Sequence, residues 1–503
     1  MNLAHLIDPH DADRVALVSR GRSTTYGALR EQVACLRGGL AGLGVAPGDR
    51  VALLCGNGRH FVLGYLATLG IGAVAVPLNP TSPAPEIERE LATVGAKVVI
   101  VEPQAATAWS HVDRANVPSV ETVVATEHPV GRHGANPIEG AIELADLCHA
   151  DPLDIVEVEA DALALLVFTS GTAGSPRAAM LSHGNLLANL DQGRSVHAQI
   201  EQDDVVYGVL PMFHIFGLNV VLGLTLARGA TIVLVQRFDP ATALDTIRER
   251  KVTVVPGAPP MWTAFAHFAE IPEDAFATVR LALTGAAKMP EDASRRLTER
   301  FGLHLAEGYG LTEAAPIVTS SAGLPPHVGS VGKVLEGMQV RLVDESGDDV
   351  LAGDSGEIWV KGPNVFLGYL GEPEQTARVL TADGWLRTGD IATVDDDGYL
   401  YLVDRAKDLI IVSGFNVYPA EVEEVLLKHP GIAEAGVVGV PHPHTGEAVK
   451  AFVIAEPGAD LDEEQLIQWC CDHLARYKCP TKVLFVDELP RNVSGKLVRR
   501  SLT

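Results

Sequence analysis

The chain is poor in the residues that would build a metal cluster, a disulfide scaffold or a basic surface. It has six cysteines among 503 residues, and no pair of them shows the C-x-x-C spacing typical of zinc and redox sites. Lysine and arginine number 39 against 64 aspartates and glutamates, so the formal net charge is −25. Such a field repels nucleic acid and anionic membrane surfaces. We therefore expect no nucleic-acid partner, and we expect reduced thiols in a cytoplasmic protein.

Long uninterrupted apolar runs are also missing. Residues 61–78 carry no charge and match a bilayer in length, but glycines and a proline interrupt them. Residues 61–69 are typical of a buried helix that stops at Gly70, and residues 73–76 are typical of a strand. The N-terminus lacks the basic-then-apolar pattern of a signal peptide. These features predict a chain without a transmembrane segment.

A regular alternation of helical and strand patterns is present instead. Hydrophobic residues make up 47% of the chain, enough for a large core. The first half alternates amphipathic helices with short β-branched runs, which indicates parallel sheets covered by helices. Residues 104–160 are weakly patterned, and we expect surface excursions there. The predicted fold class is α/β, with a large N-terminal domain of helix-covered parallel sheets plus a β-rich subdomain, and a small mobile α+β C-terminal domain.

A short polar loop at residues 168–177 directly follows an apolar run that is typical of a buried strand. Its glycines let backbone N–H groups approach an anion, its hydroxyls add donors, and Arg177 adds a fixed positive charge. This chemistry suits the β- and γ-phosphates of a nucleotide, although the loop lacks the Walker ending Gly-Lys-Ser/Thr. The predicted phosphate-binding residues are Thr169, Ser170, Gly171, Thr172, Gly174 and Arg177.

The loop resembles the phosphate loop of the acyl-adenylate-forming enzymes, which include acyl-CoA synthetases, adenylation domains and firefly luciferase. Their usual form is Thr-Ser-Gly-Thr-Thr-Gly-x-Pro-Lys-Gly. This chain departs from it with Ala173 for Thr, Arg177 for Lys and Ala178 for Gly. Arg177 keeps the charge without the compact ammonium, and Ala173 removes a donor. These departures predict weaker ATP affinity or slower turnover.

A second string, residues 307–313, follows in the order that the resemblance requires. An aromatic residue between two glycines can lie flat against a purine, and Glu313 offers a hard oxygen ligand suited to Mg²⁺. The resemblance implies that Tyr309 stacks on the adenine and that Glu313 holds the metal, together with Thr172. The other residues that it implies around the nucleotide are Gly285, Ala286, Glu307, Gly308, Gly310 and Thr312.

Two further strings, residues 385–390 and 404–421, extend the resemblance toward the C-terminus. A carboxylate beside a glycine turn, as at Asp390, can accept both ribose hydroxyls. The resemblance implies Arg405 as a second ribose contact, Lys407 as the hinge residue, and Gly414 in a loop that lines the pantetheine tunnel. Taken alone, the run after residue 404 is equally typical of a charged linker.

Lys496 and His214 complete the predicted catalytic residues, with Glu313 and Arg177. A lysine this close to a chain end is usually solvated, but the resemblance implies that Lys496 bridges the substrate carboxylate and the α-phosphate. A compact ammonium there lowers the repulsion between two approaching anions. His214 lies among apolar residues, which is typical of a core histidine. The resemblance places it near the reacting carbonyl.

The ordered strings span essentially the whole chain and imply an AMP-forming acyl-CoA synthetase that uses ATP, Mg²⁺ and CoA. In that family a carboxylate attacks the α-phosphate to give acyl-AMP and pyrophosphate, and a thiol then displaces AMP. Both steps use one site because a C-terminal domain rotates. We therefore predict an adenylation domain over residues 1–403, β-rich from about 329, a hinge over 404–408 and a C-terminal domain over 409–503.

The acid is predicted from segments expected to line its pocket, which are apolar and contain no Arg or Lys: 213–225, 256–262, 285–287 and 314–318. A dicarboxylate would need a cation there, and an amino acid would need a carboxylate. A medium- or long-chain fatty acid is the first prediction and an aryl acid the second.

Three alternatives stay open. The first is a fatty acyl-AMP ligase that loads an acyl carrier protein, although its usual insert in the β-rich region is missing here. The second is an oxygenase of luciferase type, which shares the adenylation half-reaction. The third is a non-catalytic nucleotide or acyl-AMP binding protein, against which Glu313 and Lys496 argue. The oligomeric state does not follow from the sequence.

Overall fold

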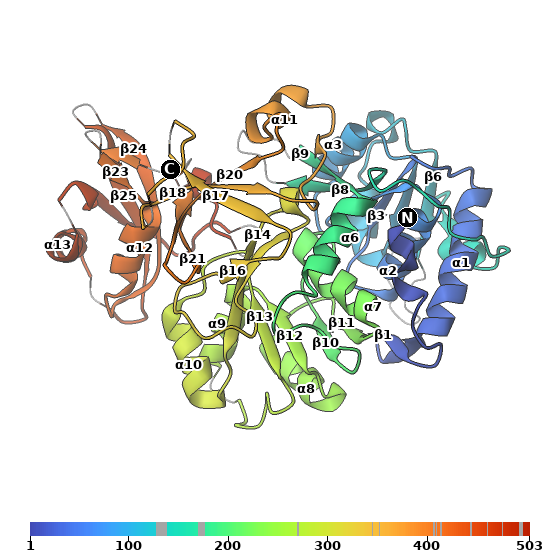
Figure 1. Ribbon diagram of the computed structural model, residues 1–503, viewed down its shortest axis with the longest axis horizontal. Coiled ribbons are helices and arrows are strands. Elements are labelled where there is room, and N and C mark those ends of the chain that lie inside the picture. Colours follow the sequence, from blue (N-terminus) through green and yellow to red (C-terminus); the bar gives the residue numbers. More distant parts are fainter. Residues whose placement is uncertain are drawn as a thin grey trace.

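The computed structural model describes most of the chain: residues 1–126, 138–169, 177–268, 271–344, 346–351, 353–405, 408, 410–412, 415–442, 445–459, 461–474, 476–491 and 496–502. Two large sheets with helices on their faces make up the first two thirds of the molecule (Figure 1). A smaller sheet follows, and the C-terminal unit, orange to red, lies at one end of the molecule. This is the mixed α/β fold class that the sequence predicts.

The first large sheet has the strand order β19-β9-β8-β4-β3-β5-β6-β7, and its pairing is parallel from β8 to β7. Its strands are β3 (Arg50–Leu54), β4 (Val74–Pro77), β5 (Val98–Val101), β6 (Thr122–Ala125), β7 (Ile142–Glu143), β8 (Leu163–Thr169), β9 (Arg177–Ser182) and β19 (Gly368–Tyr369). The expectation of surface excursions over residues 104–160 is wrong for β6 and β7, which extend this sheet. They carry too few residues for a clear period-two pattern.

The second large sheet has the order β16-β15-β14-β13-β12-β10-β11-β1-β2, and it is parallel from β14 to β1. Its strands are β1 (Val15–Ser19), β2 (Arg22–Thr25), β10 (Val205–Gly208), β11 (Thr231–Leu234), β12 (Val254–Gly257), β13 (Leu281–Thr284), β14 (Leu305–Gly310), β15 (Ile317–Ser320) and β16 (Lys333–Val334). Parallel strands bring their carboxyl ends to one edge, where the site described below lies.

Helices cover both sheets. Among them, α2 is buried over ten consecutive residues, as expected for a helix between two layers. The helices of this part are α1 (Tyr26–Gly42), α2 (Arg59–Gly70), α3 (Ala84–Val94), α4 (Ala106–Trp109), α5 (Leu144–Leu147), α6 (His183–Gln192), α7 (Leu224–Arg228), α8 (Pro240–Arg250), α9 (Pro259–His267) and α10 (Glu291–Phe301). Within the described residues, no helix combines the length and hydropathy that a bilayer crossing needs.

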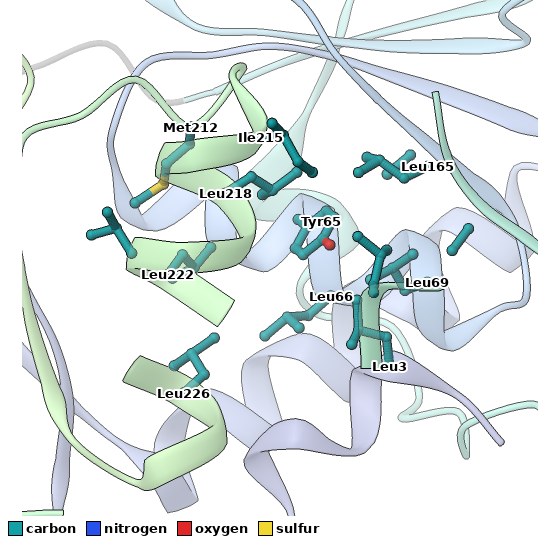
Figure 2. Packing of buried hydrophobic residues seen from close by; sticks show 14 of the residues in the cluster. Leu3, Tyr65, Leu66, Leu69, Leu165, Met212, Ile215, Leu218, Leu222 and Leu226 are labelled. Atoms are coloured by element: carbon teal, nitrogen blue, oxygen red, sulfur yellow. The ribbon is translucent and has the colours of Figure 1, made fainter. Parts of the chain in front are cut away.

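One helix decides the shape of the site. It begins as a π-helix, η4 (Phe216–Gly223), and continues directly as α7. Figure 2 shows its leucines Leu218, Leu222 and Leu226 packed toward Tyr65, Leu66 and Leu69 of α2. Because these leucines recur every fourth residue, one face of the helix is fixed against the core, and the opposite face is left for something else.

The remainder is β-rich and then α+β. An antiparallel sheet has the order β17-β18-β20-β21, from β17 (Gln339–Val343), β18 (Gly356–Lys361), β20 (Leu386–Val394) and β21 (Leu400–Arg405), with α11 (Pro373–Val379) beside it. The C-terminal unit contains β22 (Ile410–Val412), β23 (Phe415–Val417), β24 (Ile432–His442), β25 (Gly446–Ala455), β26 (Lys482–Phe485), α12 (Pro419–Leu427) and α13 (Glu463–His473). Its core cluster includes residues of both helices.

Candidate active site

A cavity of about 660 Å³ lies where parallel strands of the second sheet end. Leu210, Ala258 and Gly285 come just after β10, β12 and β13, and all three line it. Ligands of open α/β sheets bind at such carboxyl edges. We call residues 284–286 and 306–312 the turn wall of this cavity. We call the cavity-lining residues of η4 and α7 the helix wall, which comprises Phe216, Gly217, Val220, Leu224 and Arg228.

The turn wall brings together residues that the sequence predicts around the nucleotide. These are Gly285, Ala286, Glu307, Gly308, Tyr309, Gly310 and Thr312. Ala286 has φ +71°, a left-handed conformation that is uncommon outside glycine and that clusters at functional sites. Gly310 is required for packing, since a Cβ there would collide with the carbonyl oxygen of Pro316.

Tyr309 and Asp390 come from different sheets and meet beside the turn wall. The Tyr309 hydroxyl donates a hydrogen bond of 2.7 Å to Asp390 Oδ2, and both side chains are buried. Asp390 lies in β20 directly opposite Arg405 of β21, so the two predicted ribose contacts occupy one register position. The Arg405 side chain lies outside the described part. A buried carboxylate that is already hydrogen-bonded is held in place to accept further donors.

Glu313 and Arg177 are linked through a residue that the sequence analysis missed. The Tyr369 hydroxyl donates a 2.7 Å hydrogen bond to Glu313 Oε1, and the Arg177 guanidinium lies 5.6 Å from the centre of the Tyr369 ring. Arg177 Nε is 3.1 Å from Glu372 Oε2. Burial, with the neighbouring Glu313 charge, raises the pKa of Tyr369, so its hydroxyl stays a donor. Tyr369 thereby orients the predicted metal ligand, and no sequence motif marks it.

The phosphate loop is described only at its two borders. Thr169 ends β8 and Arg177 begins β9, and the two residues are cross-strand partners. Other predicted residues lie outside the described part of the chain: Ser170, Gly171, Thr172, Gly174, Lys407 and Gly414.

His214 and Thr284 contribute polar atoms to a largely apolar stretch of the cavity. Both residues line it, and neither His214 Nε2 nor Thr284 Oγ1 has a hydrogen-bond partner among the described residues. Burial lowers the pKa of His214 to about 4, so the imidazole is neutral near pH 7. Buried polar atoms without a protein partner are uncommon, and a bound ligand is one explanation for them. The sequence analysis missed Thr284.

The helix wall corrects the expectation of a cation-free acid pocket. Phe216, Val220 and Leu224 line the cavity at four-residue spacing, and the next residue in that series is Arg228. Gln199 lines the cavity beside it and accepts a hydrogen bond from Arg228 Nη2. The sequence analysis missed both because its nearest pocket segment covered only residues 213–225. A lone Arg at a helix C-terminus is ordinarily explained by the helix dipole.

Lys496 is the one predicted catalytic residue that belongs to the C-terminal unit. It lies next to Leu497, which forms an isolated β-bridge with Arg491. Lys496 is described by the structure but is not among the residues that line the cavity. The structure thus brings together most of the described site residues without this lysine.

Comparison with known proteins agrees with this arrangement over nearly the whole chain. The AMP-binding enzyme family matches residues 8–370, and the AMP-binding enzyme C-terminal domain matches residues 421–496. The chain is 40% identical over 481 residues to a feruloyl-CoA synthase from Amycolatopsis sp, covering 95% of this chain and 93% of the relative. It is 36% identical over 516 residues to a long-chain-fatty-acid–CoA ligase from Yersinia pestis, covering 98% and 91%.

A solved structure shows the same fold. ATP-bound MatB from Rhodopseudomonas palustris superposes with a TM-score of 0.90 at 32% identity, covering 100% of this chain and 98% of that one. Two family matches follow each other along the chain, and relatives above 30% identity cover almost its full length. Together they assign the family. This chain belongs to the AMP-binding enzyme family.

Proposed function

We propose that the cavity binds a carboxylic acid with an apolar body along its helix wall and presents the carboxylate at the turn wall. The chain is an AMP-forming acyl-CoA synthetase that uses ATP, Mg²⁺ and CoA. The observation that carries the proposal is the cavity of about 660 Å³, which joins the predicted nucleotide residues to an apolar helix face. A site of this shape lets one bound acid meet both ATP and CoA.

The first half-reaction joins two anions, and the protein's contribution is charge compensation. A carboxylate oxygen bonds to the α-phosphorus, and the bond from that phosphorus to pyrophosphate breaks. We assign charge neutralisation to Lys496 and Arg177, and we assign adenine stacking to Tyr309. Asp390 and Arg405 would hold the ribose. In the second half-reaction the thiolate sulfur of CoA bonds to the acyl carbon, and AMP leaves.

Among the described residues, Glu313 fits a magnesium ion on the nucleotide phosphates. Glu313 Oε1 accepts the Tyr369 hydrogen bond, which leaves Oε2 as a hard oxygen ligand, and Thr172 is the second proposed ligand. When bound, Mg²⁺ withdraws charge from the phosphate oxygens. Within this arrangement Tyr369 fixes the orientation of Glu313, as residues hydrogen-bonded to a metal ligand do at other metal sites.

Two classes of acid fit the helix wall. The run Phe216, Val220 and Leu224 suits the methylene chain of a medium- or long-chain fatty acid, and the Yersinia pestis relative carries that name. An aryl acid is the second candidate, which the feruloyl-CoA synthase relative and the polar Arg228 both support. A carrier protein in place of CoA stays an alternative acceptor.

The two half-reactions are proposed to alternate by rotation of the C-terminal unit. We place the adenylation domain at residues 1–403, the hinge at 404–408 and the C-terminal domain at 409–503. In the present arrangement Lys288 Nζ lies 3.3 Å from Glu424 Oε2, and this contact ties α12 to the large domain. Both side chains are about half exposed, so the contact adds little to stability and would not hinder rotation.

The proposal is tested by pyrophosphate release with a panel of acids, each run with and without CoA, and with the products read by mass spectrometry. Acetate, octanoate, palmitate, benzoate, 4-coumarate and malonate sample the relevant classes. We expect acyl-CoA from acids with an apolar body and none from malonate. Acyl-AMP that accumulates whether or not CoA is present would indicate a carrier-protein acceptor. Absence of pyrophosphate with every acid would contradict the proposal.

A further inference from the structure

The helix that forms the helix wall has two opposite faces with different tasks. Leu218, Leu222 and Leu226 pack into the core on one side (Figure 2), whereas Phe216, Val220, Leu224 and Arg228 line the cavity on the other. The two series are offset by two residues, which is about half a helical turn. The core leucines therefore fix the rotation of the helix and point the second series, including Arg228, toward the cavity.

Arg228 is the last member of this series, twelve residues after Phe216, whose ring lies beside Gly285 of the turn wall. A rise of at most about 1.5 Å per residue places it within roughly 18 Å of Phe216 along the helix axis. Val196, Ala198, Gln199 and Ile200 line the cavity from the loop that follows α6, and Gln199 is hydrogen-bonded to Arg228. The body of an acid lying along the helix wall therefore points its far end at Arg228 and Gln199.

The Arg228 guanidinium has N–H donors that are not used within the described residues. Among the described residues it donates one hydrogen bond, from Nη2 to Gln199 Oε1, which leaves Nε and Nη1 for another acceptor. A guanidinium offers five N–H donors in a fixed fork and cannot be deprotonated in a protein. The hydrogen bond to Gln199 limits how the fork can turn.

The surroundings leave this cation incompletely neutralised. Burial and the like charge of Arg194 lower the pKa of Arg228, while Asp191 and Glu201 act in the opposite direction. Asp191 is itself 3.4 Å from Arg194 Nε, so its charge is shared. A partly desolvated guanidinium favours an oxygen acceptor over a methyl group, because contact with a methyl group removes water without replacing its hydrogen bonds.

We propose that Arg228 and Gln199 form a polar subsite that selects acids carrying an oxygen acceptor at the end remote from the reacting carboxylate. This inference rests on the proposed function and narrows it from an apolar acid to an acid with an apolar body and an oxygenated far end. Phenol, alkyl hydroxyl and second carboxylate groups share this chemistry. The apolar residues between the two ends exclude short dicarboxylates, whose second charge would lie among them.

The test compares pairs of acids that differ only at the far end: 4-coumarate against cinnamate, and 12-hydroxydodecanoate or dodecanedioate against dodecanoate. We expect kcat/KM to be about tenfold to a hundredfold higher for the oxygenated member of at least one pair, as for a hydrogen bond to a charged group. In Arg228→Met the ratio of the two kcat/KM values should fall toward one. Activity with the unsubstituted acid should be retained. Arg194→Met, which removes a neighbouring guanidinium outside the cavity lining, should keep the wild-type preference.

Two further measurements test the subsite even if no acyl-CoA forms or if Arg228→Met does not fold. Non-reactive acyl-sulfamoyl adenosines made from the same pairs report binding without turnover, so the subsite is tested even if no acyl-CoA forms. Gln199→Leu serves if Arg228→Met does not fold, and it should reduce the preference because the fork is no longer oriented. The inference is overturned if the wild type favours the unsubstituted member of every pair, or if both variants keep the wild-type ratio. Failure to form acyl-adenylate from any acid would instead contradict the proposed function.

Discussion

The turn wall and the helix wall enclose one cavity but are built in opposite ways. The turn wall consists of strand ends and glycine turns, and the carboxylates near it are already hydrogen-bonded, Asp390 by Tyr309 and Glu313 by Tyr369. The helix wall is one face of a single helix whose other face lies in the core. The chemistry shared by a family can therefore stay constant at strand ends, while the acid is chosen by side chains spaced along a helix.

The largest expected effect concerns a residue that lies on neither wall. Lys496→Ala should reduce pyrophosphate formation about 10²–10³-fold, because two anions then meet without the ammonium between them. Transfer to CoA from synthetic acyl-AMP should change little. Rapid-quench measurement of each half-reaction checks this, with Lys482→Ala, an exposed lysine of β26, as the matched control. Equal losses in both half-reactions would contradict the role of Lys496.

The next effect separates the two walls directly. Val220→Phe adds a ring between Phe216 and Arg228 on the helix wall and should lower kcat/KM about tenfold to a hundredfold for acids long enough to reach Arg228. The KM for ATP should stay unchanged, because the turn wall is untouched. Steady-state kinetics with acids of increasing length checks this, and Val220→Ile is the control. A uniform loss for short and long acids would mean that the walls are not independent.

A smaller effect is expected within the turn-wall network. Tyr369→Phe removes the 2.7 Å hydrogen bond to Glu313 and should raise the half-saturating Mg²⁺ concentration about tenfold, because the metal ligand is then no longer held in one orientation. Titration of activity with Mg²⁺ at saturating ATP measures it. Tyr401→Phe is a matched control, since Tyr401 makes an equivalent 2.9 Å hydrogen bond to Asp395 on the β-rich sheet. If both variants shift equally, Tyr369 has no special link to the metal site.

The same contrast explains what could be predicted from the sequence. The turn-wall residues stand in short contiguous strings with glycines at fixed places, so the family resemblance could name them residue by residue. The fold class followed from the alternation of helices and strands. Tyr369 could not be found in this way, because the pairing of β19 with β9 brings it to Glu313 from a distant part of the chain. Thr284 directly precedes the predicted Gly285 but ends an apolar strand, and the rotation of its helix brings Arg228 to the cavity. For Arg228, a signal was available in the sequence: the four-residue spacing that it shares with Phe216, Val220 and Leu224.

The smallest expected effect is a difference between the two walls in how the free energy of unfolding depends on pH. Burial raises the pKa of Glu307 on the turn wall to about 7, with the Met289 backbone and Lys288 opposing it. The unfolded chain releases this proton near pH 4.3, so the folded state binds more protons between about pH 4.5 and 7, and the free energy of unfolding falls as pH rises through that window. Glu307→Gln should therefore be more stable than the wild type by about 1–2 kcal/mol at pH 8 and by little at pH 5.

Denaturant unfolding at both pH values measures the difference, with Glu299→Gln, an exposed residue of α10, as the control. The guanidinium of Arg228 stays charged throughout this range, so Arg228→Met should change stability by the same amount at pH 5 and pH 8. A pH-dependent change in Arg228→Met, or a pH-independent one in Glu307→Gln, would remove the electrostatic distinction between the walls. If both hold, the turn wall carries a carboxylate that titrates near neutral pH, whereas the helix wall carries a permanent charge.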